Sequence, residues 1–399
     1  MRFETTSFVK AAAAVVAIGA GWLWCGCEAD SRMKTSGSDG DADTDADTDS
    51  DGDGDGDADG DTDADTDPCN TGTSNLGCEF YAVDLPNVSS APLAVVPHDQ
   101  QFAVVVANTS AESDATVDVY SAASATPLAT QVVPVDQITT IALPIQNIQP
   151  GATTANGLAF RIESDVPIAA YQFNPLDNTS PVYSNDASLL FPVHVLSKDY
   201  TAITGSANLV SADAFSADAA NTGGFVAVVA TEDDTVVTLY PTNPLYPGVY
   251  QDVSLDRGQV LTAISSGTGA GGSLSGTRVA ADKRVAVFAG SVATSEPSNT
   301  TECCADHVEH QMLPLEAWGS AYAVHPAADA KGNGDCDSVF RVSAGFDGTQ
   351  LEYTPAAPAG APTTLDAYQT AEFRTNQAFV VASTDEEKPI SVTQFLISN

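Results

Sequence analysis

Short runs of β-branched residues, each followed by a polar turn and then an alternating strand, recur along the chain from Cys69 to Asn399. Residues 102–107, 225–230 and 339–344 are three such runs, and their composition is typical of β-strands. No segment carries a helical stripe of apolar residues over about twelve positions between capping residues, so we expect no long helices. The pattern predicts an all-β fold.

The turns themselves repeat. An Asp-x-Thr sequence precedes an alternating strand at Asp114, Asp233 and Asp347. Because an aspartate can accept a hydrogen bond from the backbone two residues on, we expect each of these side chains to close its own turn. Turn formation, rather than catalysis, is therefore the role predicted for them.

A second set of matching segments carries an aromatic residue near its end. The segments are 164–173, 281–290 and 386–395, and their aromatic residues are Phe173, Phe288 and Phe395. Repetition at intervals of about 115 residues is typical of a chain built from copies of one small domain. We expect about three β-sandwich-like modules, at approximately 69–200, 201–300 and 301–399.

An acidic repeat precedes these modules. Every odd-numbered position from Asp39 to Asp67 is an aspartate, 15 in all, with only Ala, Thr, Gly or Ser between them. Such a segment has no large apolar group to bury, so residues 27–68 are predicted to form a disordered, extended Asp-rich linker. The whole chain has 53 acidic and 14 basic residues, a formal net charge of −39, which excludes nucleic-acid or polybasic membrane binding as a main role.

Calcium binding is the alternative interpretation of the repeat. Asp49, Asp51, Asp53 and Gly54 match the first half of an EF-hand loop, but its twelfth position, where a bidentate Glu is required, is Gly60. A stoichiometric EF-hand is therefore excluded, while weak, non-stoichiometric calcium association is left open. No other cofactor is expected.

The first 26 residues resemble a bacterial lipoprotein signal. Arg2 and Lys10 are followed by an apolar stretch that is too short to span a bilayer. Gly26 precedes Cys27, the residue expected to be lipidated, and Cys25 competes less well because Trp24 stands before it. Signal cleavage without lipidation is the alternative. Both interpretations predict export to the bacterial cell envelope, and lipidation predicts an outer-membrane or cell-surface lipoprotein.

Residues 301–322 hold the densest group of reactive side chains. Cys303, Cys304, His307 and His310 could together bind zinc, with the two histidines one helical turn apart. The competing interpretation is a disulfide-bonded turn, because exported thiols oxidise and Cys336 lies downstream. The disulfide is favoured, and His307 with His310 is kept as a weaker metal-site alternative.

The remaining cysteines support disulfide bonding without fixing every pair. Cys69 and Cys78 are nine residues apart and could close a loop at the edge of the first module. One of Cys303 and Cys304 could then pair with Cys336, which leaves one thiol over.

Three segments together resemble the N-terminal domain family of the IgGFc-binding protein, as found in bacterial surface lipoproteins. They are residues 77–87, 171–192 and 303–322, and the strand at 225–239 fits the same pattern. The resemblance spans about Cys78 to Asn399. It implies a β-rich, extracellular, non-enzymatic binding or adhesion module, and it supplies no Fc-contacting or catalytic residues for this chain.

The expected function is therefore display of a binding surface on an acidic spacer, with an extracellular protein, glycan or matrix component as partner. The membrane is contacted only through the lipid. One alternative is a metal-dependent hydrolase centred on His307, Glu309 and His310. Another is a structural envelope or matrix component whose acidic tethers are bridged by calcium.

Overall fold

The structure is a computed structural model. It describes residues 69, 71–88, 96–121, 124–146, 153–154, 159–177, 184–207, 223–267, 269–297, 305–328 and 336–397. The signal, Cys27, the Asp-rich linker, Cys303 and Cys304 lie outside the described residues. Within them the chain is all-β, as predicted, with short 3₁₀ segments only. No helix of this part is long and apolar enough to span a membrane.

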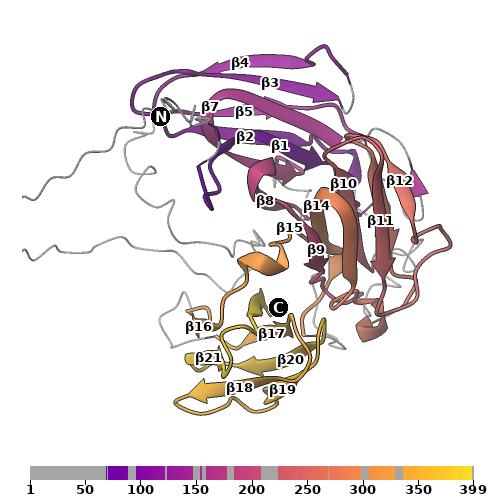
Figure 1. The fold of residues 1–399 in the computed structure, drawn as a ribbon, viewed down its shortest axis with the longest axis vertical. Helices are drawn as coiled ribbons and strands as arrows, with labels where there is room; N and C mark the ends of the chain where they lie inside the picture. The colour runs from indigo at the N-terminus through magenta and orange to yellow at the C-terminus, as the bar shows by residue number, and fades with distance from the viewer. Residues whose placement is uncertain are drawn as a thin grey trace, which may run out of the picture.

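The strands fall into three groups that follow one another along the chain (Figure 1). The first group contains β1 (Gly77–Val83), β2 (Ala103–Asn108), β3 (Ala115–Ser121), β4 (Ala129–Val133), β5 (Ile138–Ala142), β7 (Ala159–Asn174) and β8 (Asp186–Leu190). The second contains β9 (Ser197–Thr201), β10 (Gly224–Ala230), β11 (Thr235–Tyr240), β12 (Val253–Leu255), β13 (Val260–Ile264), β14 (Arg278–Thr294) and β15 (Asp306–Gln311). The third contains β16 (Ala321–Val324), β17 (Ser338–Ala344), β18 (Thr349–Thr354), β19 (Thr364–Leu365), β20 (Thr370–Thr375), β21 (Phe379–Ser383) and β22 (Ile390–Leu396).

Five short elements complete the fold. They are β6 (Thr153–Thr154), which pairs with β13, and the 3₁₀ segments η1 (Pro97–Asp99), η2 (Val193–Val195), η4 (Gly269–Gly272) and η5 (Leu315–Ala317). The segments η2 and η5 occupy matching places, because each joins the last strand of one group to the first strand of the next.

One plan of strand pairing is repeated in the three groups. In the first, the N-terminal half of β7 pairs with β1 and β3, and its C-terminal half pairs with β2 and β8. In the second, β14 pairs in the same way with β9 and β11, then with β10 and β15. In the third, two strands replace the long one: β21 pairs with β16 and β18, and β22 pairs with β17.

Pairing also defines where each group ends. β15 pairs with β14, so residues 306–311 group with the second set of strands and not with the segment 301–399. In the same way β9, which begins at Ser197, groups with the strands that follow it.

The central strands are apolar on both faces because both faces are covered. In β10, Val226, Val228 and Ala230 pack in the core of the second module, while Phe225 and Val229 pack in the core of the first. A strand buried on both sides needs no polar alternation, which explains the continuous apolar run at 225–230.

The aspartates of the Asp-x-Thr turns act differently from the prediction. Each accepts a hydrogen bond from the backbone N–H of the neighbouring hairpin turn rather than from the residue two positions on. The pairs are Asp114 with Val135 (3.0 Å), Asp233 with Arg257 (3.0 Å) and Asp347 with Ala367 (3.1 Å). The repeat thus joins two turns in every module.

The predicted equivalence of Phe173, Phe288 and Phe395 is wrong for its middle member. Ile168, Val285 and Ile390 pair with the last residues of β2, β10 and β17. Five positions further on lie Phe173, Gly290 and Phe395, so glycine takes the aromatic position in β14. A Cβ at Gly290 would overlap the carbonyl oxygen of Val308 and come within 2.8 Å of the Phe225 ring, so the close approach of β15 requires glycine here.

Candidate functional site

The reactive segment predicted near residue 307 is a β-strand. Because β15 runs from Asp306 to Gln311, its side chains alternate between two faces. His307 and Glu309 share one face, and His310 lies on the other, where its ring meets Phe191 edge-on at 6.4 Å. The helical spacing assumed for the two histidines is therefore wrong, and the strand does not bring them to one site.

His307 and Glu309 form a buried pair at the junction of the first and second modules. His307 Nε2 lies 3.0 Å from Glu309 Oε2, and neither side chain is exposed to solvent. The imidazole stacks on Phe225, with ring centroids 5.9 Å apart. The carboxylate also accepts hydrogen bonds from Gln172 (2.9 Å) and Asn174 (3.2 Å), both on β7. The pair thus joins β15 to the first module.

The side chains of β8 and the preceding loop hold the outer edge of β15. Ser184, Asp186 and Ser188 accept hydrogen bonds from alternate backbone N–H groups of β15. The bonds are His307 N–H to Ser184 Oγ (2.9 Å), Glu309 N–H to Asp186 Oδ2 (2.8 Å) and Gln311 N–H to Ser188 Oγ (2.8 Å). These side chains accept the hydrogen bonds that the backbone of a neighbouring strand would otherwise accept. We call the group Ser184, Asp186, Ser188, His307 and Glu309, with Gln172 and Asn174, the first joint.

Burial raises the proton affinity of the first joint. It raises the pKa of Asp186 to about 8, to which the charge of Glu309 adds, and it raises the pKa of Asp306, which lies beside the joint at the start of β15, to about 7. Burial alone would lower the pKa of His307, but the hydrogen bond and charge of Glu309, with Asp186 and Asp306, outweigh it and raise that pKa. The joint therefore retains protons near neutral pH.

The first joint is enclosed between strands β7, β8 and β10. Its carboxylates accept hydrogen bonds from backbone N–H groups and side-chain amides, whereas His307 Nδ1 is buried without a hydrogen-bond partner among the described residues. Within the described residues, no three His, Cys, Asp or Glu side chains are grouped in a way that could hold a metal ion. Of the predicted hydrolase centre, the structure brings together His307 and Glu309 but leaves His310 apart.

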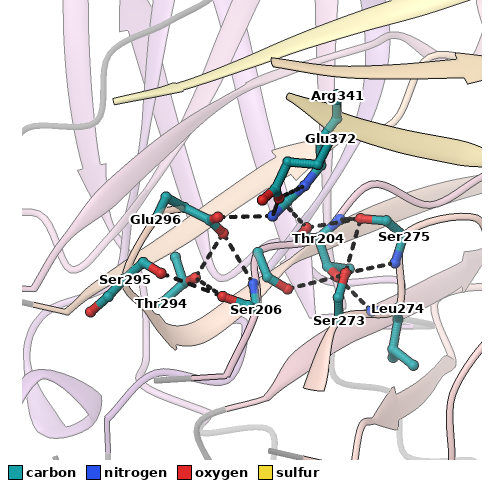
Figure 2. A network of polar contacts seen from close by, with 11 residues as sticks. Thr204, Ser206, Ser273, Leu274, Ser275, Thr294, Ser295, Glu296, Arg341 and Glu372 are labelled. Atoms are coloured by element: carbon teal, nitrogen blue, oxygen red, sulfur yellow. Dashed lines mark hydrogen bonds and ion pairs between the residues drawn. The ribbon is translucent and has the colours of Figure 1, made fainter. Parts of the chain in front are cut away.

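A second polar cluster joins the second and third modules, and Figure 2 shows its contacts. Arg341 of β17 is 3% exposed and forms ion pairs with Glu296 (2.8 Å) and Glu372 (2.6 Å). Its guanidinium also donates to the carbonyl oxygen of Thr204 and lies 4.4 Å from the centroid of the Phe395 ring. We call Arg341, Glu296, Glu372 and Thr204 the second joint.

Further hydrogen bonds fix Glu296 within the second joint. Its Oε1 accepts from the Ser206 N–H at 3.1 Å and from the Thr294 hydroxyl at 3.0 Å (Figure 2). Burial raises the pKa of Glu296, while the positive charge of Arg341 opposes that effect. Arg341 thus supplies the counter-charge for a carboxylate that lies in the protein interior.

The cysteines are placed only in part. Cys69 and Cys78 form a disulfide with Cα atoms 5.2 Å apart, as predicted. Cys336 lies just before β17, and its N–H donates to the Ala327 carbonyl at 2.7 Å. Its predicted pairing with Cys303 or Cys304 falls on residues outside the described part of the chain.

Comparison with known families decides the identity of the chain. The family model described as IgGFc binding protein matches residues 186–399, more than half of the sequence. The chain belongs to the IgGFc-binding protein family. The family match begins at β8 and runs through the second and third modules. The part of the expected resemblance between Cys78 and residue 185 lies outside the match and stays a prediction. No curated protein and no solved structure matches the chain.

Membership of the IgGFc-binding protein family indicates a binding domain of the kind found in secreted and surface proteins. Sequence reasoning did not predict the roles of Asp186 and Arg341. Arg341 could have been flagged, because it stands inside the apolar run 339–344. The role of Asp186 could not, because in sequence an acid at the start of a strand is indistinguishable from a turn residue.

Proposed function

We propose that this IgGFc-binding family member is a non-enzymatic binding protein of the bacterial cell surface. In this proposal a lipid on Cys27 anchors the chain, the Asp-rich segment keeps the body away from the membrane, and the β modules bind an extracellular protein. The family match over residues 186–399 is the observation that carries the proposal.

The modules suit this role because they provide a stiff frame. Each joint is a buried polar network whose hydrogen bonds have defined directions, so it fixes the orientation of adjacent modules better than apolar packing alone. Loops and strand edges held on such a frame are pre-organised, which lowers the entropy that is lost on binding. The strong negative charge favours partners with basic surfaces.

Surface display is tested by labelling intact cells that express the full chain with an antibody to the third module. We expect labelling of intact cells and incorporation of radiolabelled palmitate, with both lost in Cys27→Ser. Palmitate incorporation that persists in Cys27→Ser would contradict the assigned lipidation site. Labelling only after cell lysis would contradict surface display.

Binding is tested with the purified full chain on an array of extracellular proteins and glycans that includes the Fc fragment of immunoglobulin G. We expect saturable binding to a protein and no dependence on added zinc. Saturable binding to glycans alone would overturn the protein-partner proposal, and one tightly held zinc per chain with hydrolysis of a substrate would replace it with the enzyme. Self-association that requires calcium and residues 39–67 would favour the structural role.

A further inference from the structure

Within the described residues, the third module has no counterpart of one strand that the other two modules have. In the first module β8 pairs antiparallel with the C-terminal half of β7, and in the second β15 pairs with the same part of β14. In the third module β22 takes the place of the C-terminal halves of β7 and β14. Among the described residues β22 pairs with β17 at one edge of a three-stranded sheet, and on its other edge its first residue, Ile390, forms an isolated bridge with Gly319.

Hydrogen bonding shows which backbone groups of β22 point away from β17. The N–H of Gly345 donates to the carbonyl of Pro389 (3.2 Å), and antiparallel pairs alternate between bonded and non-bonded. Residues 391, 393 and 395 therefore bond to β17, whereas Val392, Gln394 and Leu396 point outward. The same parity holds in β14, where the carbonyl of Val287 accepts from Met312, the residue after β15, at 2.7 Å.

The outward groups of Val392, Gln394 and Leu396 bind nothing in the described part of the chain. Charged residues and proline commonly protect an edge strand from pairing with another chain. Strand β22 is seven residues long and contains neither. Leu396 is 55% exposed, and Val392 and Gln394 are half-buried. From Val392 to Leu396 the edge is thus open and regular.

We propose that the free edge of β22 is the ligand-binding site, and that its ligand is an extended segment of a partner protein that adds to the sheet as an antiparallel strand. This inference rests on the proposed binding function and specifies where and how the partner is held. Strand addition at an open edge is a common mode of peptide recognition, in which the backbone provides affinity and alternate side chains provide specificity.

The strands at the corresponding edges indicate the chemistry of this ligand. Val392 of β22 corresponds to Ala170 of β7 and Val287 of β14, whose partners are Leu190 and Met312. An aliphatic residue is therefore expected opposite Val392. Gln394 corresponds to Gln172, whose partner is Ser188, so a small or polar residue is expected two positions before the aliphatic one.

The experiment uses the full chain and a synthetic peptide of residues 184–192, which contains β8 and the aliphatic residue at Leu190. The key variant is Gln394→Pro, which removes an outward N–H without breaking the ladder to β17. Its matched control is Gln394→Ala, because both variants lose the side-chain hydrogen bond to Ser338 (3.0 Å). Binding is measured by fluorescence anisotropy of the labelled peptide.

We expect the wild-type chain and Gln394→Ala to bind the peptide with affinities within about threefold, and Gln394→Pro to bind at least about tenfold more weakly, the equivalent of about 1.4 kcal/mol. A peptide with Ser188→Pro should also bind poorly. Equal binding by Gln394→Pro and Gln394→Ala, or no binding by the wild-type chain, would overturn the edge site and leave the array test of the general binding function untouched. Loss of self-association in Gln394→Pro without peptide binding would overturn the partner and identify a second copy of the chain as the occupant.

Discussion

Arg341 is the residue on which the second joint depends. It neutralises Glu296 in the interior, where an uncompensated carboxylate is costly. We expect Arg341→Met to lower the free energy of unfolding by about 3–5 kcal/mol, measured by urea denaturation. Adding Glu296→Gln should recover much of this loss, because the carboxylate then no longer needs a counter-charge.

Arg374 provides the control for this prediction. It pairs with Asp337 at 2.8 Å on the same module, but the two side chains are 50% and 40% exposed. Arg374→Met should cost less than about 1 kcal/mol. Equal losses in Arg341→Met and Arg374→Met would show that the buried network does not stabilise the joint.

The first joint predicts how stability depends on pH. Asp186 and Asp306 have pKa values raised to about 8 and about 7, and that of His307 is also raised, so the folded chain binds protons that the unfolded chain releases. Their contribution is present at low pH and is lost as pH rises toward 8. Each such group lowers the folding constant by up to about tenfold per pH unit in that interval.

This prediction is checked by urea denaturation between pH 5 and pH 9. The midpoint should fall as pH rises, and the slope should be smaller in Asp186→Asn, whatever the absolute stability of that variant. The exposed Asp136, changed to Asn, serves as the control, because it lies outside the joint. An unchanged slope in Asp186→Asn would show that Asp186 does not take up the proton.

At the scale of the strands, the approach of β15 to β14 depends on Gly290. We expect Gly290→Ala to destabilise the chain by about 1–3 kcal/mol, because its Cβ would overlap the Val308 carbonyl and press on Phe225. Gly271→Ala is the matched control, since a Cβ there meets nothing within 4 Å. Thermal unfolding compares the two. A loss of the same size in Gly271→Ala would remove the steric explanation.

The strands could be predicted from sequence far better than the joints. Runs such as 102–107 and 225–230 can be recognised as strands from their β-branched composition. The threefold repeat can be recognised from turn residues that lie close together in the sequence. The joints could not be predicted, because Asp186 and Glu309 are 123 residues apart and meet only after two modules have packed. Periodicity also misassigned Phe288, since one glycine changes which residue occupies the aromatic position without changing the strand pattern.

The reactive segment shows why a motif needs its secondary structure. His307 and His310 would share a face of a helix, but a strand places them on opposite faces. The same strand makes His307 and Glu309 neighbours. Spacing alone indicated that these side chains make contacts, but it did not indicate which residues they contact.

On the scale of the whole molecule, three copies of one module are linked, and in the first two copies the long central strand is followed by a short strand at its edge. In the first two copies this strand belongs to the chain and leads into the next module through η2 or η5. In the third copy the described chain supplies no such strand. That edge, which the first two copies fill with a strand of the chain itself, is the one that we propose a partner occupies in the third.

Amide hydrogen exchange of the free full-length chain tests this account most directly. The amides of Val392, Gln394 and Leu396 should exchange at least about a hundredfold faster than their counterparts in β7. Those counterparts are Ala170, Gln172 and Asn174, which pair with β8 and are therefore protected on that edge. Equal protection of the two sets would mean that the edge of β22 is already covered, and it would contradict the open binding edge on which the account rests.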